Sequence, residues 1–414
     1  MEKTVSSTDR PARFIDVHVL QSVPFANLNR DDTDSVKTVQ YGNAQRTRVS
    51  SQSWKRAARE KFQEEIGERA LRTRRIGERV TRELLEERGW PEPLAQRAGA
   101  HVAAGSSIKF ELAKDKPKEK DAADGGAAKK DTKAVVPNKV LTNALVYVPE
   151  TAVRELADIA EQHREKLESA KDIKKSSDKS VLPQATIDGV LRARNGVINL
   201  FGRMLAEVDD AGVDGAVQVA HAMTTHETDV EFDYFSAVDD VNQQWDDATG
   251  SGHMGHGQYS AGTFYRFATI DLEELAGNIG NDAASVRELT GAFLATFVES
   301  LPGAKKNSTA PYTAPGLIHL AVRADRPLSF AAAFEKPVRS TRGEGFEAPS
   351  VARLTEYAEQ ANKMLGSHRL LASGWVSIGH DDAKNLGVRY DGITDLVKAT
   401  LRSALGEKTG EVSA

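Results

Sequence analysis

One stretch of this sequence cannot join a folded core. From residue 113 to residue 134 every position is Ala, Lys, Asp, Glu, Pro, Gly or Thr. Because such a composition offers no apolar face to bury, it predicts a mobile insertion. The full 414 residues also exceed the usual size of one compact domain. We therefore expect two to three lobes, one of which carries the insertion.

Apolar periodicity predicts an α+β fold around this insertion. Alternation of apolar and polar residues predicts strands at residues 13–20, 216–223, 261–272 and 316–323. Helical spacing predicts helices from Ser50 or Ser51 to Ile66, twice between 67 and 89, and at 149–167, 284–301, 350–365 and 393–405. This order indicates an α+β core that a mostly helical lobe interrupts.

Positive charge is concentrated at one place in a chain whose formal net charge is −5. The segment "QRTRVSSQSWKRAARE" (residues 45–60) carries five arginines and lysines where a loop is predicted to become a helix. At about 100° per residue, Gln52, Lys55, Arg56 and Arg59 share one helix face. Arg46 and Arg48 are expected to approach the same end from the loop.

Cations at the start of a helix are unfavourable for the helix, because its dipole already places positive partial charge there. An anionic partner offsets this cost, and the free N–H groups of a helix start bind phosphate oxygens well. The pattern therefore favours phosphate binding. Two alternatives stay open, namely a solvated helix face paired with acids such as Glu60, and an acidic protein partner.

Catalytic motifs are scarce in this sequence. The absence of cysteine excludes disulfides, a thiol nucleophile and Cys-ligated metals. His221, His226, Asp239 and Asp240 leave open a metal-dependent ribonuclease, although their spacing matches no established ligand motif. We expect no cofactor and no resident metal. No apolar run approaches the ~20 residues of a membrane span, and a cytoplasmic location is expected.

Two further features bear on nucleic-acid binding. Tyr234 and Phe235 are adjacent aromatic residues, which can either stack on unpaired bases or anchor the core of a hairpin. Lys305 and Lys306 lie in "LPGAKKNSTAP", which lacks the glycine spacing of a nucleotide P-loop. An exposed loop is the simpler interpretation of this second basic spot.

Several segments together resemble a known family. The segments "FIDVHVL…LNRDD…RVSSQSWKRAAR", "DGAVQVAHAMTTHETDVEFDYFSAVDD", "GTFYRFATIDL" and "PGAKKNSTAP" are similar to CasC, the multi-copy backbone protein of the type I-E CRISPR surveillance complex, Cascade. The resemblance follows the chain from about residue 14 to residue 311. It implies a modified RNA-recognition-motif (ferredoxin-like) palm with a helical fingers insertion and an extended thumb. The palm would use residues 11–66, 216–222 and 263–405, the fingers 67–215 and the thumb 223–262.

The resemblance also implies a function. Family members bind the crRNA guide without cutting it, assemble as a helical filament along the spacer, kink the guide and present it for pairing with target DNA. The implied partners are the crRNA, target DNA through the guide, other copies of the chain, and CasA, CasB, CasD and CasE. Matching motif positions imply that the RNA-binding residues are Asn29, Arg30, Gln52, Lys55, Arg56, Arg59, Arg203, Met204, Tyr234, Phe235, Lys305 and Lys306.

Overall fold

The structure is a computed structural model that describes residues 11–113, 140–237, 253–340 and 343–407. The chain divides into two compact units, which we call unit 1 (residues 1–66 and 216–414) and unit 2 (residues 67–215). Apart from Ala113, the predicted insertion at 113–134 lies outside the described residues, as do Asp239 and Asp240. The palm, fingers and thumb boundaries stay predictions.

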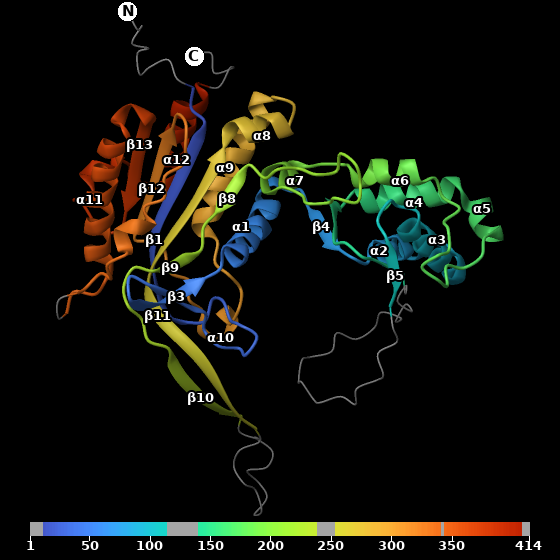
Figure 1. The fold of residues 1–414 in the computed structure, drawn as a ribbon, viewed down its shortest axis with the longest axis horizontal. Coiled ribbons are helices and arrows are strands. Elements are labelled where there is room, and N and C mark those ends of the chain that lie inside the picture. The colour runs from blue at the N-terminus through green and yellow to red at the C-terminus, as the bar shows by residue number, and fades with distance from the viewer. Residues whose placement is uncertain (1–10, 114–139, 238–252, 341–342, 408–414) are drawn as a thin grey trace, which may run out of the picture. The chain divides into compact units, whose positions relative to one another are not determined.

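A large sheet forms the centre of unit 1 (Figure 1). Its strand order is β14-β13-β12-β1-β11-β9-β3-β2, and β8 and β10 also pair with β11. Among the described residues every one of these pairings is antiparallel except β13 with β14. The strands are β1 Phe14–Ala26, β2 Thr38–Tyr41, β3 Ala44–Val49, β8 Val217–Val219, β9 Ala222–Thr224, β10 Glu231–Ala237, β11 His253–Asp271, β12 Leu317–Arg323, β13 Leu370–Ser377 and β14 Val388–Arg389.

Helices cover both faces of this sheet. They are α1 Ser51–Ile66, α8 Leu272–Asn278, α9 Ala283–Glu299, α10 Lys306–Thr309, α11 Glu347–Leu365 and α12 Ile393–Leu405, with short 3-10 turns η3 Ala331–Phe334, η4 Ser367–Arg369 and η5 Lys384–Leu386. The predicted alternation of β11 is confirmed, because Phe264 packs with Trp54 of α1 whereas Tyr265 packs with Leu354 of α11. Side chains on the two faces of one strand thus join two separate cores.

The strand expected at 216–223 is interrupted. Val219 pairs with Ala268 and Met223 pairs with Tyr265, so this segment holds one more residue than the facing stretch of β11. An extra residue on one strand is a β-bulge, which redirects side chains at the edge of a sheet. His221 lies in this bulge and is exposed.

Unit 2 combines helices with two small two-stranded sheets. Its elements are β4 Ala70–Thr73, α2 Ile76–Arg82, the π-helix η1 Glu83–Glu87, α3 Glu92–Ala104, β5 Phe110–Leu112, β6 Val140–Thr142, β7 Val146–Pro149, α4 Ala152–Gln162, α5 Arg164–Ser169, α6 Gln184–Leu191 and α7 Gly196–Phe201. The sequence did not predict β4, and the helix expected at 149–167 begins at Ala152 and breaks at His163. No helix in the described part of the chain has the length and apolar character that a membrane span requires.

Candidate nucleic-acid interface

The start of α1 is held by side chains from two other segments. Ser50 caps the helix, since its Oγ accepts the N–H of Ser53 at 3.3 Å. The N–H of Ser50 donates to Oδ1 of Asn29 at 2.8 Å, which ties the loop after β1 to the helix. The N–H of Ser51 donates to Nδ1 of His221 at 3.1 Å. The first turn of α1 is therefore fixed in place, and its sequence contains no acidic residue.

One side of α1 is buried and the other carries the predicted polar residues. Trp54, Ala57, Ala58 and Phe62 face the core. Gln52 and Arg56 are exposed, whereas Lys55 and Arg59 are half-buried. Nζ of Lys55 donates to the carbonyl oxygen of Val217 at 3.2 Å. Arg56 pairs with Glu60 at 2.8 Å, an exposed ion pair of the kind that contributes little to stability.

Arg46 does not approach the helix start, and that expectation is wrong. It lies in β3, where its guanidinium is buried. It donates to the carbonyl oxygens of Thr224, Phe334 and Glu335 at 2.9, 3.0 and 3.3 Å. Burial lowers the pKa of Arg46, but the three carbonyl groups compensate for the water that burial removes. Arg46 therefore holds segments of unit 1 together.

Arg48 does lie beside the helix start. Its Nη1 is 3.3 Å from Nδ1 of His221, the atom that also accepts the N–H of Ser51. Because Nδ1 accepts the N–H of Ser51, the neutral imidazole carries its proton on Nε2. Partial burial and the charge of Arg48 lower the pKa of His221, which favours this neutral form. Sequence reasoning considered His221 only as a metal ligand.

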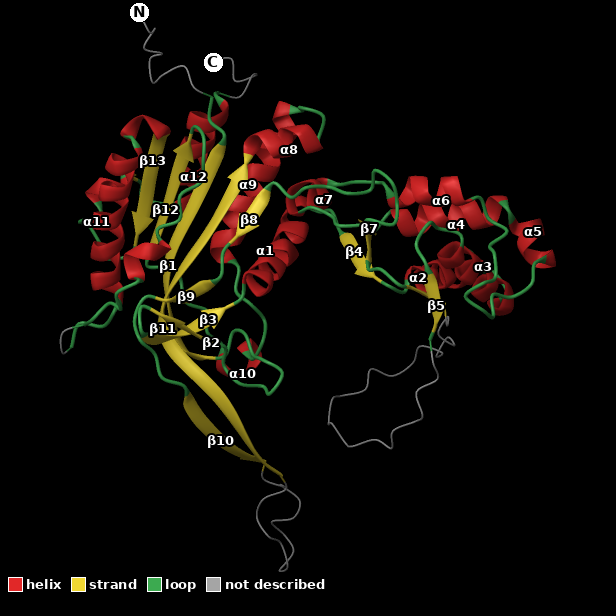
Figure 2. Ribbon diagram, in the orientation of Figure 1, coloured by secondary structure: helices red, strands yellow, loops and turns green. Residues whose placement is uncertain are grey.

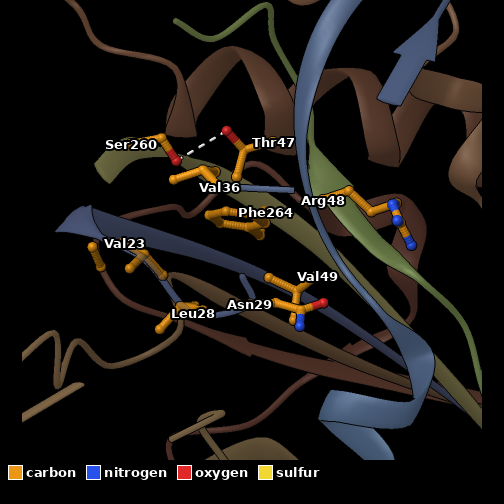
Figure 3. A pocket seen from close by; sticks show the side chains of 10 residues that line it. Val23, Leu28, Asn29, Val36, Thr47, Arg48, Val49, Ser260 and Phe264 are labelled. Atoms are coloured by element: carbon orange, nitrogen blue, oxygen red, sulfur yellow. Dashed lines mark hydrogen bonds between the residues drawn. The ribbon is translucent and has the colours of Figure 1, made fainter. Parts of the chain in front are cut away.

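A small pocket lies under the loop that carries Asn29 (Figure 3). It is lined mainly by apolar side chains, and the hydroxyls of Thr47 and Ser260 bond to each other at 2.9 Å. Figure 3 shows Arg48 directed away from this apolar lining. Leu28 and Val36 of the loop contribute to the apolar lining, while Asn29 and Arg48 belong to its polar edge.

Arg30 and Lys305 share one acidic partner. Both pair with Asp34, and the Lys305 contact is 2.7 Å long. The hydrogen bond from Lys305 is the largest cause that lowers the pKa of Asp34. Lys305 also donates its backbone N–H to the carbonyl oxygen of Asn27 at 3.1 Å. Part of the expected positive charge is therefore neutralised within the chain.

The β10–β11 hairpin presents aromatic side chains on both faces. Figure 2 shows it extending away from the helices of unit 1. Phe232 and Tyr234 share one face and are 59% and 76% exposed. Phe235, 51% exposed on the other face, packs over Gly255, where a Cβ atom would lie 2.4 Å from the ring. Sequence reasoning missed Phe232, although its i, i+2 spacing to Tyr234 was visible.

Arg203 and Met204, which belong to unit 2, are placed very differently. Met204 is 89% exposed, whereas Arg203 is only 3% exposed. The Arg203 guanidinium donates to four carbonyl oxygens at 2.7–3.2 Å, those of Ala211, Ala193, Arg192 and Tyr147. Burial lowers the pKa of Arg203 to about 10. This geometry favours a structural role for Arg203, and we leave it out of the candidate interface.

The placement of His226 does not support the ribonuclease alternative. Nδ1 of His226 bonds to the carbonyl oxygen of Glu227 at 2.8 Å, and its Nε2 accepts the N–H of Thr263 at 3.1 Å. Its ring also stacks on Phe346 at 3.6 Å. Both nitrogens of His226 therefore have partners within the fold. Across the described ranges, no three His, Asp or Glu residues are grouped so that they could hold a metal ion.

Comparisons with known proteins give consistent results. The family model described as CT1975-like protein matches residues 15–399. A chain of the structure described as "CRISPR RNA-guided surveillance complex, pre-nicking" is 41% identical, with a TM-score of 0.81. A chain of a second "CRISPR RNA-guided surveillance complex" is 36% identical, with a TM-score of 0.72. Each comparison covers 94% of this chain and 100% of the other. No curated protein sequence matches the chain.

Proposed function

This chain belongs to the CT1975-like protein family, and we propose that it is an RNA-binding backbone subunit of a CRISPR RNA-guided surveillance complex. One observation carries the proposal, namely the 41% identity and TM-score of 0.81 to a chain of such a complex over 94% of the sequence. Similarity of this degree along nearly the whole chain supports a shared role as well as a shared fold.

The start of α1 supports this proposal on physical grounds. Gln52 and Arg56 are exposed there, Lys55 and Arg59 lie beside them, and the helix dipole adds positive potential. Such groups bind phosphates, which every RNA sequence shares. A surface of this kind would hold guides of different sequence and leave recognition of the target to base pairing.

We infer more specifically that the chain is a CasC-type subunit of a type I-E Cascade in the cytoplasm. Several copies would lie side by side as a helical filament along the crRNA spacer. The β10–β11 hairpin of each copy would kink the guide, which would then pair with target DNA. CasA, CasB, CasD and CasE would complete the complex. The chain would have no catalytic step of its own.

A binding experiment tests the phosphate surface. We would measure the affinity for two unstructured RNAs of unrelated sequence at several salt concentrations, using wild type and Lys55→Gln/Arg56→Gln. The variant should bind both RNAs more weakly, by the same factor. The slope of log affinity against log salt should become shallower by about 0.7 for each phosphate that the variant no longer neutralises.

A matched control separates location from total charge. Lys61→Gln/Lys363→Gln also removes two positive charges, from residues that pair with Glu299 and Glu359. This control should bind RNA like wild type. Lys61 lies in the second half of α1, away from the helix start. Weaker binding to only one of the two RNAs, or equal weakening in both double variants, would therefore contradict phosphate binding at the start of α1.

A further inference from the structure

The loop after α9 places an exposed aromatic ring beside a cation. Tyr312 is 69% exposed, and Nζ of Lys306 lies 5.8 Å from the centre of its ring. This distance is within the range of a cation–π contact. Residues 300–316 contain two lysines and no Asp or Glu, so the chain sequence supplies no acidic group within this loop. Tyr312 lies just outside the "PGAKKNSTAP" segment.

The backbone on both sides of Tyr312 is anchored, on one side to β1 and on the other to the loop that follows β1. The carbonyl oxygen of Thr313 accepts a hydrogen bond from Nε2 of Gln21 at 2.7 Å, and Oγ1 of Thr313 donates to the carbonyl oxygen of Ser22 at 2.7 Å. On the other side, Lys305 donates its N–H to Asn27 at 3.1 Å. An exposed ring on an anchored backbone loses little further entropy when a ligand binds it.

A strained residue turns the chain two positions before Tyr312. Ala310 has a φ of 45°, a left-handed conformation that is unfavourable for a residue with a Cβ atom. Its N–H donates to the carbonyl oxygen of Lys306 at 2.8 Å, and its own carbonyl accepts the N–H of Tyr312 at 2.8 Å. These bonds hold Lys306 and Tyr312 on one short turn. Backbone strain of this kind is often found where a side chain is presented to a ligand.

The turn is connected to the candidate interface through a single loop. Lys305 bonds to the backbone of Asn27, and two residues later Asn29 bonds to Ser50 at the start of α1. The helix start and the Tyr312 turn are thus attached to the same short stretch of chain. The loop after β1 therefore supports both the helix start and the turn that carries Lys306 and Tyr312.

We propose that Tyr312 and Lys306 form a nucleotide-binding site for single-stranded RNA. A base stacks on the face of the Tyr312 ring opposite Lys306, and the Lys306 ammonium pairs with an adjacent phosphate. Every base has a π face, so this contact tolerates any sequence. The inference rests on the proposed function. It adds a contact to a base, whereas the proposed surface at the start of α1 contacts only phosphates.

The test uses short single-stranded RNAs that carry the fluorescent adenine analogue 2-aminopurine at successive positions. Wild type should quench the 2-aminopurine fluorescence, because a base that stacks on the Tyr312 ring loses its emission. Tyr312→Phe keeps the aromatic face and should behave like wild type. Tyr312→Leu keeps apolar bulk only, so it should abolish the quenching and bind about five-fold or more weakly.

Lys306→Gln tests the second half of the site without touching the ring. It should weaken binding and reduce its salt dependence, while Lys384→Gln, which removes a charge from η5, should change neither. If Tyr312→Leu quenches and binds like wild type while Lys55→Gln/Arg56→Gln is impaired, the stacking site is wrong and the proposed function stands. If wild type binds no RNA, the proposed function itself is wrong, and the stacking site with it.

Discussion

The side-chain oxygen of Asn29 lies 2.8 Å from the backbone nitrogen of Ser50 and accepts its hydrogen bond. This contact joins the loop after β1 to the cap of α1. It gives Asn29 a positioning role, because it places the loop against the helix start where the exposed Gln52 and Arg56 lie.

Substitutions at Asn29 should separate stability from RNA binding. Asn29→Ala removes the acceptor and should lower the free energy of unfolding by about 1 kcal/mol. Asn29→Asp keeps an acceptor and should retain most of that stability, yet its negative charge should weaken RNA binding. Urea unfolding and RNA affinity measure the two effects. Equal stability of Asn29→Ala and wild type would show that the bond contributes nothing.

The aromatic residues of the hairpin should respond differently to truncation. Tyr234 is 76% exposed, so Tyr234→Ala should leave thermal unfolding unchanged while it impairs assembly on RNA. Phe235→Ala uncovers Gly255 and should loosen the hairpin itself. Hydrogen exchange at the amides of residues 255–259 measures this loosening. Faster exchange in Tyr234→Ala than in Phe235→Ala would contradict the assignment.

The sequence predicted the elements with strong periodicity. Strand β12 and helices α1, α9 and α12 appear close to their expected bounds, whereas β1 begins as expected but continues six residues past its expected end, to Ala26. Local periodicity does not reveal a β-bulge, because a bulge depends on how the strand pairs with its neighbour. The bulge at His221 depends on the register against β11, and the break at His163 lies within a helix whose pattern looked continuous.

The candidate site was predictable only in part, and its arginines show why. Arg56 and Arg46 look alike in the sequence, yet one is exposed and the other buried. Burial of Arg46 depends on carbonyl groups of Thr224 and Phe334, which are distant in the chain and meet only in the fold. Arg203 is buried for the same reason, since its guanidinium bonds to carbonyl groups that come together only in the fold. A charged residue next to a polar motif in the sequence is therefore not necessarily exposed in the fold.

Arg203→Ala should destabilise unit 2. The substitution leaves four carbonyl oxygens without their donor, and the expected decrease in the free energy of unfolding is about 3 kcal/mol or more. Met204→Ala, at an 89% exposed position, is the matched control and should unfold like wild type. Thermal unfolding measures both. A stable Arg203→Ala that binds RNA poorly would return Arg203 to the interface.

Two buried histidines should make stability depend on pH. His319 donates from Nδ1 to the carbonyl oxygen of Gly374 at 3.0 Å and stacks on His18, 5.2 Å away. Burial, reinforced by the charge of Arg323, lowers the pKa of His319 to about 4. Burial likewise lowers the pKa of His18, so both rings are neutral in the folded chain.

The sign of the effect follows from proton uptake. Between pH 6.5 and about 4 the unfolded chain binds a proton at His319 that the folded chain does not, so stability is full above pH 6.5 and falls as pH falls. The decrease attributable to His319 should approach about 3 kcal/mol near pH 4. Urea unfolding of wild type and His319→Gln across this range measures it. An equally steep decline in His319→Gln would contradict this assignment.

The most direct test of the proposed function is the particle mass, measured by size-exclusion chromatography with light scattering, with and without a spacer-length unstructured RNA. Wild type and Lys61→Gln/Lys363→Gln should grow into a multi-copy particle only when RNA is present, and Lys55→Gln/Arg56→Gln should not. A wild-type mass that does not respond to RNA would contradict the role of the chain as an RNA-bound backbone subunit.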